Sequence, residues 1–136
     1  MRYIIIPLAA ALIVQLIKLT TDLAKKRFSW QRAVGYGGMP SSHSALVTSL
    51  ATIVYLLEGF SVAFAISAIL AVIIMRDAIG LRGLLSSHGR ILNKLIKDLP
   101  DEEEYKYPVM EETVAHTISQ IAVGAILGVI ITFLLF

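Results

Sequence analysis

The 136-residue sequence contains no cysteine, which excludes disulfides and thiolate metal sites. It also carries little charge: 16% of its residues are charged, whereas soluble domains contain about a quarter. The formal net charge of +2 is too small to indicate nucleic acid as a partner. Hydrophobic residues instead make up 57% of the chain. This balance indicates a membrane protein, and the length fits one domain, residues 1–136.

Four apolar segments follow one another along the chain: Tyr3–Leu19, Ala45–Leu57, Val62–Met75 (or on to Ile79) and Val114–Phe136. A helix needs about 20 residues to cross a bilayer, within a range of about 17–25. The second segment reaches this length only if its helix begins at Pro40 or Ser41, where proline suits the first turn and serine the cap. We therefore predict an all-α integral membrane bundle with about four transmembrane helices.

The topology depends on the first segment and on the basic loops. No clear small-residue cleavage site follows the first segment, so we interpret it as a retained helix and not as a cleaved signal peptide. Lysine and arginine gather in residues 20–44 and 80–112, whereas residues 58–61 contain none. Because basic loops stay in the cytoplasm, we expect a multi-pass cell-membrane protein with both termini outside. The polar residues of both basic loops should then meet at the cytoplasmic face.

Residues 84–98 form a different kind of segment, in which apolar side chains recur at helical spacing among polar ones. The apolar positions are Leu84, Leu85, Ile91, Leu92, Leu95 and Ile96. This pattern predicts an amphipathic cytoplasmic helix that lies on the membrane surface or covers a site there.

The run GGMPSSHS, residues 37–44, stands where the second helix should begin. A helix N-terminus offers unpaired N–H groups and a positive dipole end, glycines allow a ligand to approach the backbone closely, and serine hydroxyls add donors. Such a construction suits a phosphate or another oxyanion, with His43 able to give or take a proton. The alternative is a serine-capped helix after a glycine turn, with a histidine at the interface.

The fourth apolar segment carries a second histidine, His116, close to its predicted start. An ionisable residue in a membrane helix is costly and is by default a functional hypothesis. Glu112 and Gln120 lie four residues to either side and should share its helical face. Gly124 and Gly128 form a Gly-x-x-x-Gly pair, which lets another helix pack closely.

PSSH followed much later by His-x-x-x-Gln-x-x-x-Gly-x-x-x-Gly resembles the type 2 phosphatidic acid phosphatase (PAP2) superfamily, which is related to vanadium haloperoxidases. That superfamily carries Lys-x6-Arg-Pro, then Pro-Ser-Gly-His, then Ser-Arg-x5-His-x3-Asp. The short chain, GGMPSSHSA and the pattern Met75-x-Asp77-Ala78-x-Gly80-x-Arg82 are more similar to its small divergent branch. The resemblance covers residues 18–128.

The resemblance implies a role for each matching residue. His116 matches the nucleophile that forms a phosphohistidine, and His43 matches the general acid that protonates the leaving alkoxide. Lys18 matches the lysine of the first motif. Gly38, Ser41 and Ser42 match the donors that hold the phosphate. Spread negative charge in a phosphoryl transition state is stabilised by such cations and N–H donors, so neither a metal nor a cofactor is needed.

The sequence also departs from the superfamily pattern. Gln120 replaces the aspartate expected to orient the nucleophile; its amide oxygen can accept the ring N–H but brings no charge. Asp77 or Glu112 could supply that charge. Met110 and Lys25 occupy the positions of motif arginines, so other cations would have to bind the phosphate. The candidates are Arg27, Arg76, Arg82 and Arg90, of which we favour Arg82, at a helix end.

Three functions remain open. The favoured one is a membrane phosphatase acting on a lipid phosphate or pyrophosphate, because the site lies at headgroup depth. The second is a degenerate relative that binds or moves anionic headgroups without hydrolysis, which Gln120 and the missing arginine favour. A metal site of the three histidines lacks close ligand spacing. Because four helices make a thin bundle and Gly-x-x-x-Gly can join helices, we also predict a homodimer.

Overall fold

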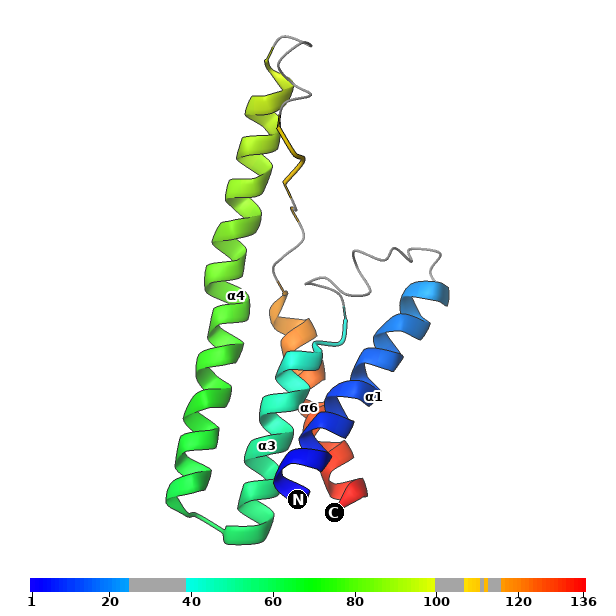
Figure 1. The fold of residues 1–136 in the computed structure, drawn as a ribbon, viewed down its shortest axis with the longest axis vertical. Coiled ribbons are helices and arrows are strands. Elements are labelled where there is room, and N and C mark those ends of the chain that lie inside the picture. Colours follow the sequence, from blue (N-terminus) through cyan, green and yellow to red (C-terminus); the bar gives the residue numbers. More distant parts are fainter. Residues whose placement is uncertain (25–38, 100–106, 111, 113–115) are drawn as a thin grey trace.

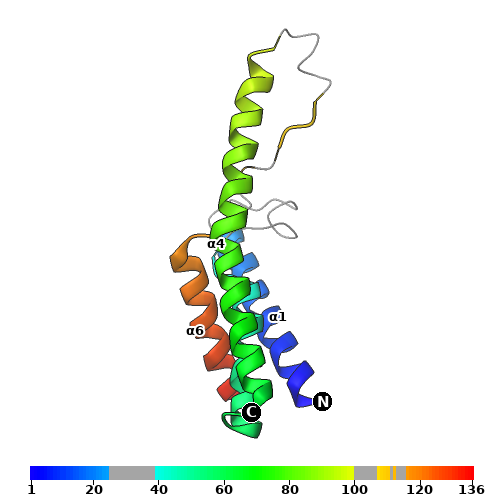
Figure 2. The same ribbon diagram turned by 90° about the vertical axis from the view of Figure 1, so that its left-hand side faces the viewer.

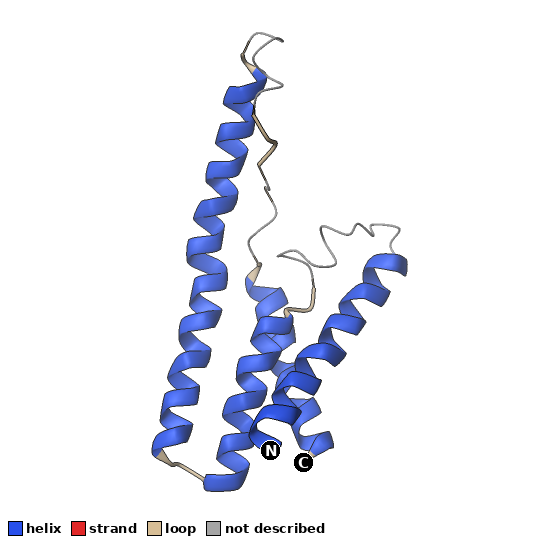
Figure 3. Ribbon diagram, viewed as in Figure 1, coloured by secondary structure: helices blue, strands red, loops and turns tan. Residues whose placement is uncertain are grey.

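The structure, a computed structural model, describes residues 1–24, 39–99, 107–110, 112 and 116–136. In this part of the chain the regular elements are all helices (Figure 3). They are α1 (Arg2–Ala24), α3 (Ser42–Glu58), α4 (Val62–Lys97) and α6 (Ile118–Leu135). The predicted all-α membrane bundle is therefore confirmed.

The central helix of the bundle is α3, which packs against α1, α4 and α6, whereas α4 scarcely touches α6 (Figures 1 and 2). Both chain termini lie at the same end as the turn between α3 and α4. The beginnings of α3 and α6 lie together towards the opposite end, where the last turns of α1 also point. The up-and-down order of the helices thus brings distant parts of the sequence together at one end.

Side-chain caps fix where α3 and α4 begin. Ser41 and Ser61 stand before α3 and α4, and their hydroxyl oxygens accept the N–H groups of Ser44 (3.3 Å) and Phe64 (3.1 Å). These bonds satisfy donors that have no partner inside the helix. At α3 the cap confirms the predicted start at the serines. Gly59 ends α3 with a φ of +66°, a conformation that glycine adopts without strain.

Close packing of α6 on α3 depends on two glycines. A Cβ atom at Gly124 would collide with the Ser41 carbonyl oxygen, and one at Gly128 would collide with Thr48 and Ala45. The close approach lets the Thr48 hydroxyl donate to the Ala125 carbonyl (3.1 Å). The predicted helix-packing role of this Gly-x-x-x-Gly pair is therefore fulfilled within one chain. The pair no longer argues for a homodimer, which stays a prediction.

Three of the described helices are long and apolar enough to cross a membrane: α1, α4 and α6. The remaining helix, α3, has 17 residues, at the lower limit for a span. Large apolar side chains cover the outer faces of the long helices, for example Leu12 on α1, Ile69 on α4 and Phe133 on α6, each about 60% exposed. Such faces suit contact with lipid, so the chain is a membrane protein.

Two predicted helix boundaries are wrong. Residues 84–98 do not form a separate helix, because α4 runs unbroken for 36 residues and extends well beyond the other helices (Figure 1). Gly80 and Gly83 do not interrupt it, since glycine costs a helix only about 1 kcal/mol. The last helix begins at Ile118 and not near Val114, because Thr117 and Gln120 form a capping box there. His116 therefore precedes the helix, and Glu112, His116 and Gln120 do not share a helical face.

Candidate functional site

The beginning of α3 is fixed against the beginning of α6. The Ser41 N–H donates to the Gln120 carbonyl (3.2 Å), and the Ser41 side chain is 1% exposed. Its hydroxyl also accepts from the Ser44 hydroxyl (3.0 Å), so this oxygen is committed to capping. Ser42 is half-buried and His43 is exposed in the same first turn. The N-terminus of α3 thus presents Ser42 and His43 at the site end of the bundle.

His116 lies buried immediately before α6, with 7% of its surface exposed. Its backbone N–H donates to the Ala78 carbonyl of α4 (3.2 Å), which attaches it to that helix. The ring Nδ1 is buried and has no hydrogen-bond partner among the described residues. Burial, followed by the charges of Arg82, His43 and Lys18, lowers the pKa of His116 to about 4. The imidazole is therefore neutral at physiological pH, the form that can attack phosphorus.

Four of the predicted site residues converge here from four separate segments. Lys18 on α1 is only 4% exposed, and Arg82 on α4 is largely covered. Both lie close enough to His43 and His116 to act on them electrostatically. The Arg82 Nε atom also lies 3.7 Å from an oxygen of Asp77, so this carboxylate partly balances the guanidinium. The result is a cationic site with a buried imidazole and an exposed one.

Gln120 and Glu112 are engaged elsewhere. The Gln120 side-chain oxygen accepts the Thr117 N–H (3.0 Å) in the capping box. Glu112 lies 3.9 Å from the Arg90 Nε atom and accepts from Asn93 (2.8 Å). Because neither oxygen is bonded to the His116 ring, the structure offers no counterpart of an orienting aspartate among the described residues.

The remaining predicted residues lie away from this centre. Arg76 is exposed on α4, and so is His88. Arg27 and Gly38 lie outside the described residues. Within the part of the chain that the structure describes, no group of three histidine or carboxylate side chains is arranged to hold a metal ion.

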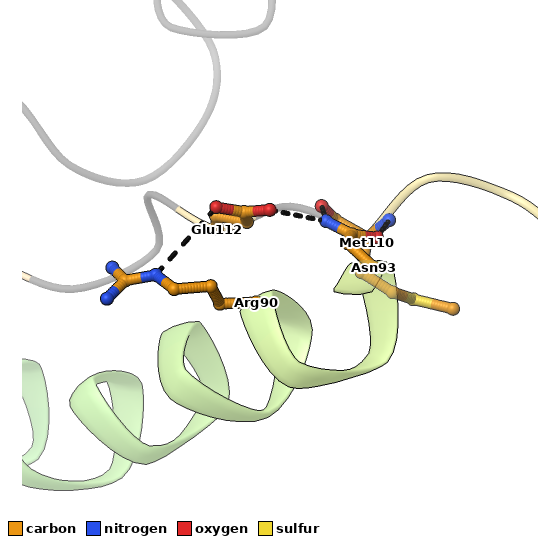
Figure 4. A network of polar contacts seen from close by, with 4 residues as sticks. All are labelled: Arg90, Asn93, Met110 and Glu112. Carbon is orange, nitrogen blue, oxygen red and sulfur yellow. Dashed lines mark hydrogen bonds and ion pairs between the residues drawn. The ribbon is translucent and has the colours of Figure 1, made fainter. Parts of the chain in front are cut away.

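Sequence reasoning missed Asn93, whose side chain is 9% exposed on α4. Its amide nitrogen donates to the Met110 carbonyl (2.8 Å) and to Glu112 (2.8 Å), and its oxygen accepts the Met110 N–H (2.7 Å; Figure 4). The signal that could have revealed this face is a stripe of small and polar residues at helical spacing. The buried members are Ala78, Ser86, Gly89 and Asn93.

Comparison with known proteins agrees with this architecture. The family model described as "Divergent PAP2 family" matches residues 1–131. An uncharacterized membrane protein of Bacillus subtilis (strain 168), YuiD, is 36% identical over 141 aligned residues, which cover 94% of this chain and 89% of the relative. No solved structure matches the chain significantly.

Proposed function

Because the chain belongs to the divergent PAP2 family, we propose that it is a membrane phosphatase that hydrolyses a lipid phosphate or pyrophosphate through a phosphohistidine at His116. The observation that carries this proposal is the convergence of Lys18, His43, Arg82 and His116 at one end of the bundle. Phosphoryl transfer to a histidine requires cations, one imidazole that attacks phosphorus and a second imidazole that can give and take a proton.

In the first step the neutral His116 imidazole attacks phosphorus, and the bond between phosphorus and the leaving oxygen breaks. Lys18 and Arg82 stabilise the charge on the phosphoryl oxygens, together with N–H groups at the start of α3 beside Ser42. His43, which is exposed, gives its proton to the departing alkoxide or, for a pyrophosphate, to the departing phosphate oxygen.

In the second step water attacks the phosphohistidine. His43, now neutral, takes the proton from that water, and inorganic phosphate leaves while His116 returns to its neutral form. No step requires a metal or a cofactor.

The substrate class follows from where the site lies. It stands at one end of a bundle whose outer faces are apolar, so a substrate with its chains in the bilayer can present its headgroup there. We also propose that this end of the bundle faces the cytoplasm, because the loops on that side are rich in lysine and arginine.

A second function has its own observation in favour. The Gln120 oxygen is used in the capping box, and the His116 Nδ1 has no described partner. Without an orienting carboxylate the same cationic site would bind anionic headgroups, or move them, without hydrolysing them. A protein with this second function would bind lipid phosphates but would not hydrolyse them.

The deciding experiment is phosphate release by the purified protein in mixed micelles. Phosphatidic acid, phosphatidylglycerol phosphate and undecaprenyl pyrophosphate are offered separately to the wild type, to His116→Ala and to His88→Ala as a matched control. We expect turnover of at least one substrate, a loss of about 1,000-fold or more in His116→Ala, and wild-type rates in His88→Ala, since His88 is exposed on α4.

The same micelles distinguish the two functions. Binding of the lipid phosphates without turnover by the folded wild type would contradict the phosphatase and support the headgroup binder. Turnover that persists in His116→Ala would show that another residue is the nucleophile.

A further inference from the structure

Residues on both sides of the connection to His116 are hydrogen-bonded to α4, at two points along the length of that helix. One attachment is the hydrogen bond from the His116 N–H to the Ala78 carbonyl (3.2 Å). The other is the Asn93 side chain, which pairs with both the N–H and the carbonyl of Met110 (2.7 and 2.8 Å). Figure 4 shows this second attachment, with Glu112 beside it.

The Asn93 amide is fully used in this attachment. Its nitrogen gives one hydrogen to the Met110 carbonyl and the other to a Glu112 oxygen (2.8 Å), and its own oxygen accepts the Met110 N–H. Glu112 is in turn 3.9 Å from the Arg90 Nε atom. Since Asn93 is 9% exposed, water competes poorly for these bonds, and leaving either partner unpaired would be costly.

The distance between the two attachment points on α4 is close to the greatest length that the chain from Met110 to His116 can reach. Ala78 and Asn93 are fifteen residues apart on α4, which corresponds to about 22 Å of helix. Met110 and His116 are six residues apart, and a chain of six residues reaches at most about 20–22 Å. The Asn93 side chain leans towards the helix N-terminus and so shortens the gap somewhat. The position at which Asn93 holds Met110 therefore limits how far along α4 His116 can lie.

We propose that Asn93 is a positioning residue for His116: by holding Met110 and Glu112 it keeps the imidazole seated beside Lys18, His43 and Arg82. For catalysis this inference rests on the proposed function, since positioning matters to turnover only if His116 is the nucleophile. Asn93 itself touches no substrate. It helps to orient the His116 ring, which Gln120 does not contact because its side-chain oxygen accepts the Thr117 N–H.

The test measures the pKa of His116, which depends on how deeply its ring is buried, and does not rely on turnover. Histidines labelled with ¹³C at Cε1 are titrated by NMR in nanodiscs, and the three signals are assigned with His43→Gln and His88→Gln. In the wild type His116 should titrate at a pKa of about 4, held low by burial and then by Arg82, His43 and Lys18. In Asn93→Ala and in Asn93→Asp the ring is released towards water, so its pKa should rise towards the ordinary value of about 6.5.

Asn93→Asp has nearly the same size but lacks the two donors and places a carboxylate beside Glu112, so it tests the bonds and not the volume. Lys94→Ala is the matched control, because Lys94 is the exposed neighbour of Asn93 on α4. An unchanged far-ultraviolet circular dichroism spectrum and an unchanged unfolding temperature in detergent show that the fold is intact. In the phosphatase assay both Asn93 variants should lose about 10- to 100-fold in turnover number, the scale of a reacting group misplaced by about 1 Å, with KM changed by less than about twofold.

The two proposals fail in different ways. If the His116 titration in both Asn93 variants matches that of the wild type, Asn93 does not position the ring, whatever happens to turnover. If the His116 pKa rises in these variants but the wild type releases phosphate from none of the lipids, the positioning role stands and the phosphatase does not.

Discussion

The two ends of the bundle differ in how completely their polar side chains are hydrogen-bonded or paired. At the end that holds the chain termini, Glu58 accepts hydrogen bonds from the Tyr3 hydroxyl (2.8 Å) and the Ser61 hydroxyl (3.0 Å). Rings of Tyr55, Phe60 and Phe64 pack edge-on or tilted beside them, with centroids 5.0–5.5 Å apart. The polar groups at this end satisfy one another, as expected where the only task is to close a turn.

At the other end the polar groups do not balance in this way. Lys18 is 4% exposed and forms no ion pair with a described carboxylate, and the His116 Nδ1 is buried without a described partner. Burying unpaired groups costs stability. A protein that keeps such groups at one end and pairs them at the other retains them for something other than folding, and binding of an anion would supply the missing partner.

Among the substitutions that test the difference between the two ends, Lys18→Met should produce the largest effect and should separate stability from function. Removing a buried charge should stabilise the fold by about 1–4 kcal/mol, the range for replacing buried ionic groups by apolar ones. Loss of a cation facing the phosphoryl group should lower phosphate release about 100-fold. Thermal unfolding in detergent and the micelle assay measure the two effects. A variant that is both less stable and fully active would show that Lys18 belongs to the packing and not to the site.

Gly124→Ala should affect both stability and activity, because Gly124 lies where α6 meets the cap of α3. The added Cβ would collide with the Ser41 carbonyl oxygen and lie 3.0 Å from the Ser41 nitrogen. Overpacking of this kind costs about 1–3 kcal/mol, and the displacement of Ser41 should lower turnover as well.

Gly80→Ala is the matched control for Gly124→Ala, since a Cβ at Gly80 meets nothing within 4 Å. It should leave activity unchanged and stabilise α4 by up to about 1 kcal/mol. Equal behaviour of the two alanine variants in thermal unfolding would mean that the α3–α6 contact does not hold the site.

Much of this arrangement could be predicted from the sequence. Long apolar runs indicated the helices, and the alternation of basic and neutral loops predicted which polar residues should share an end; Lys18, His43, Arg82 and His116 do so. The start of α6 was predictable in principle, because Thr117-Ile-Ser-Gln120 is a capping-box pattern. It was missed because the apolar run continues in front of it, to Val114.

Other features leave no readable signal. The partners of Asn93 include the backbone of Met110, seventeen residues away, and a backbone group has no sequence signature. The glycines of α4 look like helix ends, yet the helix continues through Gly80 and Gly83 because no proline follows them and the residues on either side favour helix. The contact of Gln120 could not be predicted from spacing alone either. Its position four residues after His116 suggested a contact that orients the ring, but its side-chain oxygen accepts the Thr117 N–H in the local helix cap instead.

Tyr3→Phe should give the smallest effect, and it tests the paired end. The variant removes the hydroxyl that donates to Glu58 (2.8 Å) and leaves the ring in place. Because this hydrogen bond is exposed and Glu58 keeps Ser61 as a donor (3.0 Å), the free energy of unfolding should fall by only about 0.5–1 kcal/mol. Phosphate release should stay at the wild-type rate, since the substitution lies at the opposite end from His116. A loss of turnover comparable with that of Lys18→Met would show that the two ends are coupled, and that the site at one end depends on the paired groups at the other.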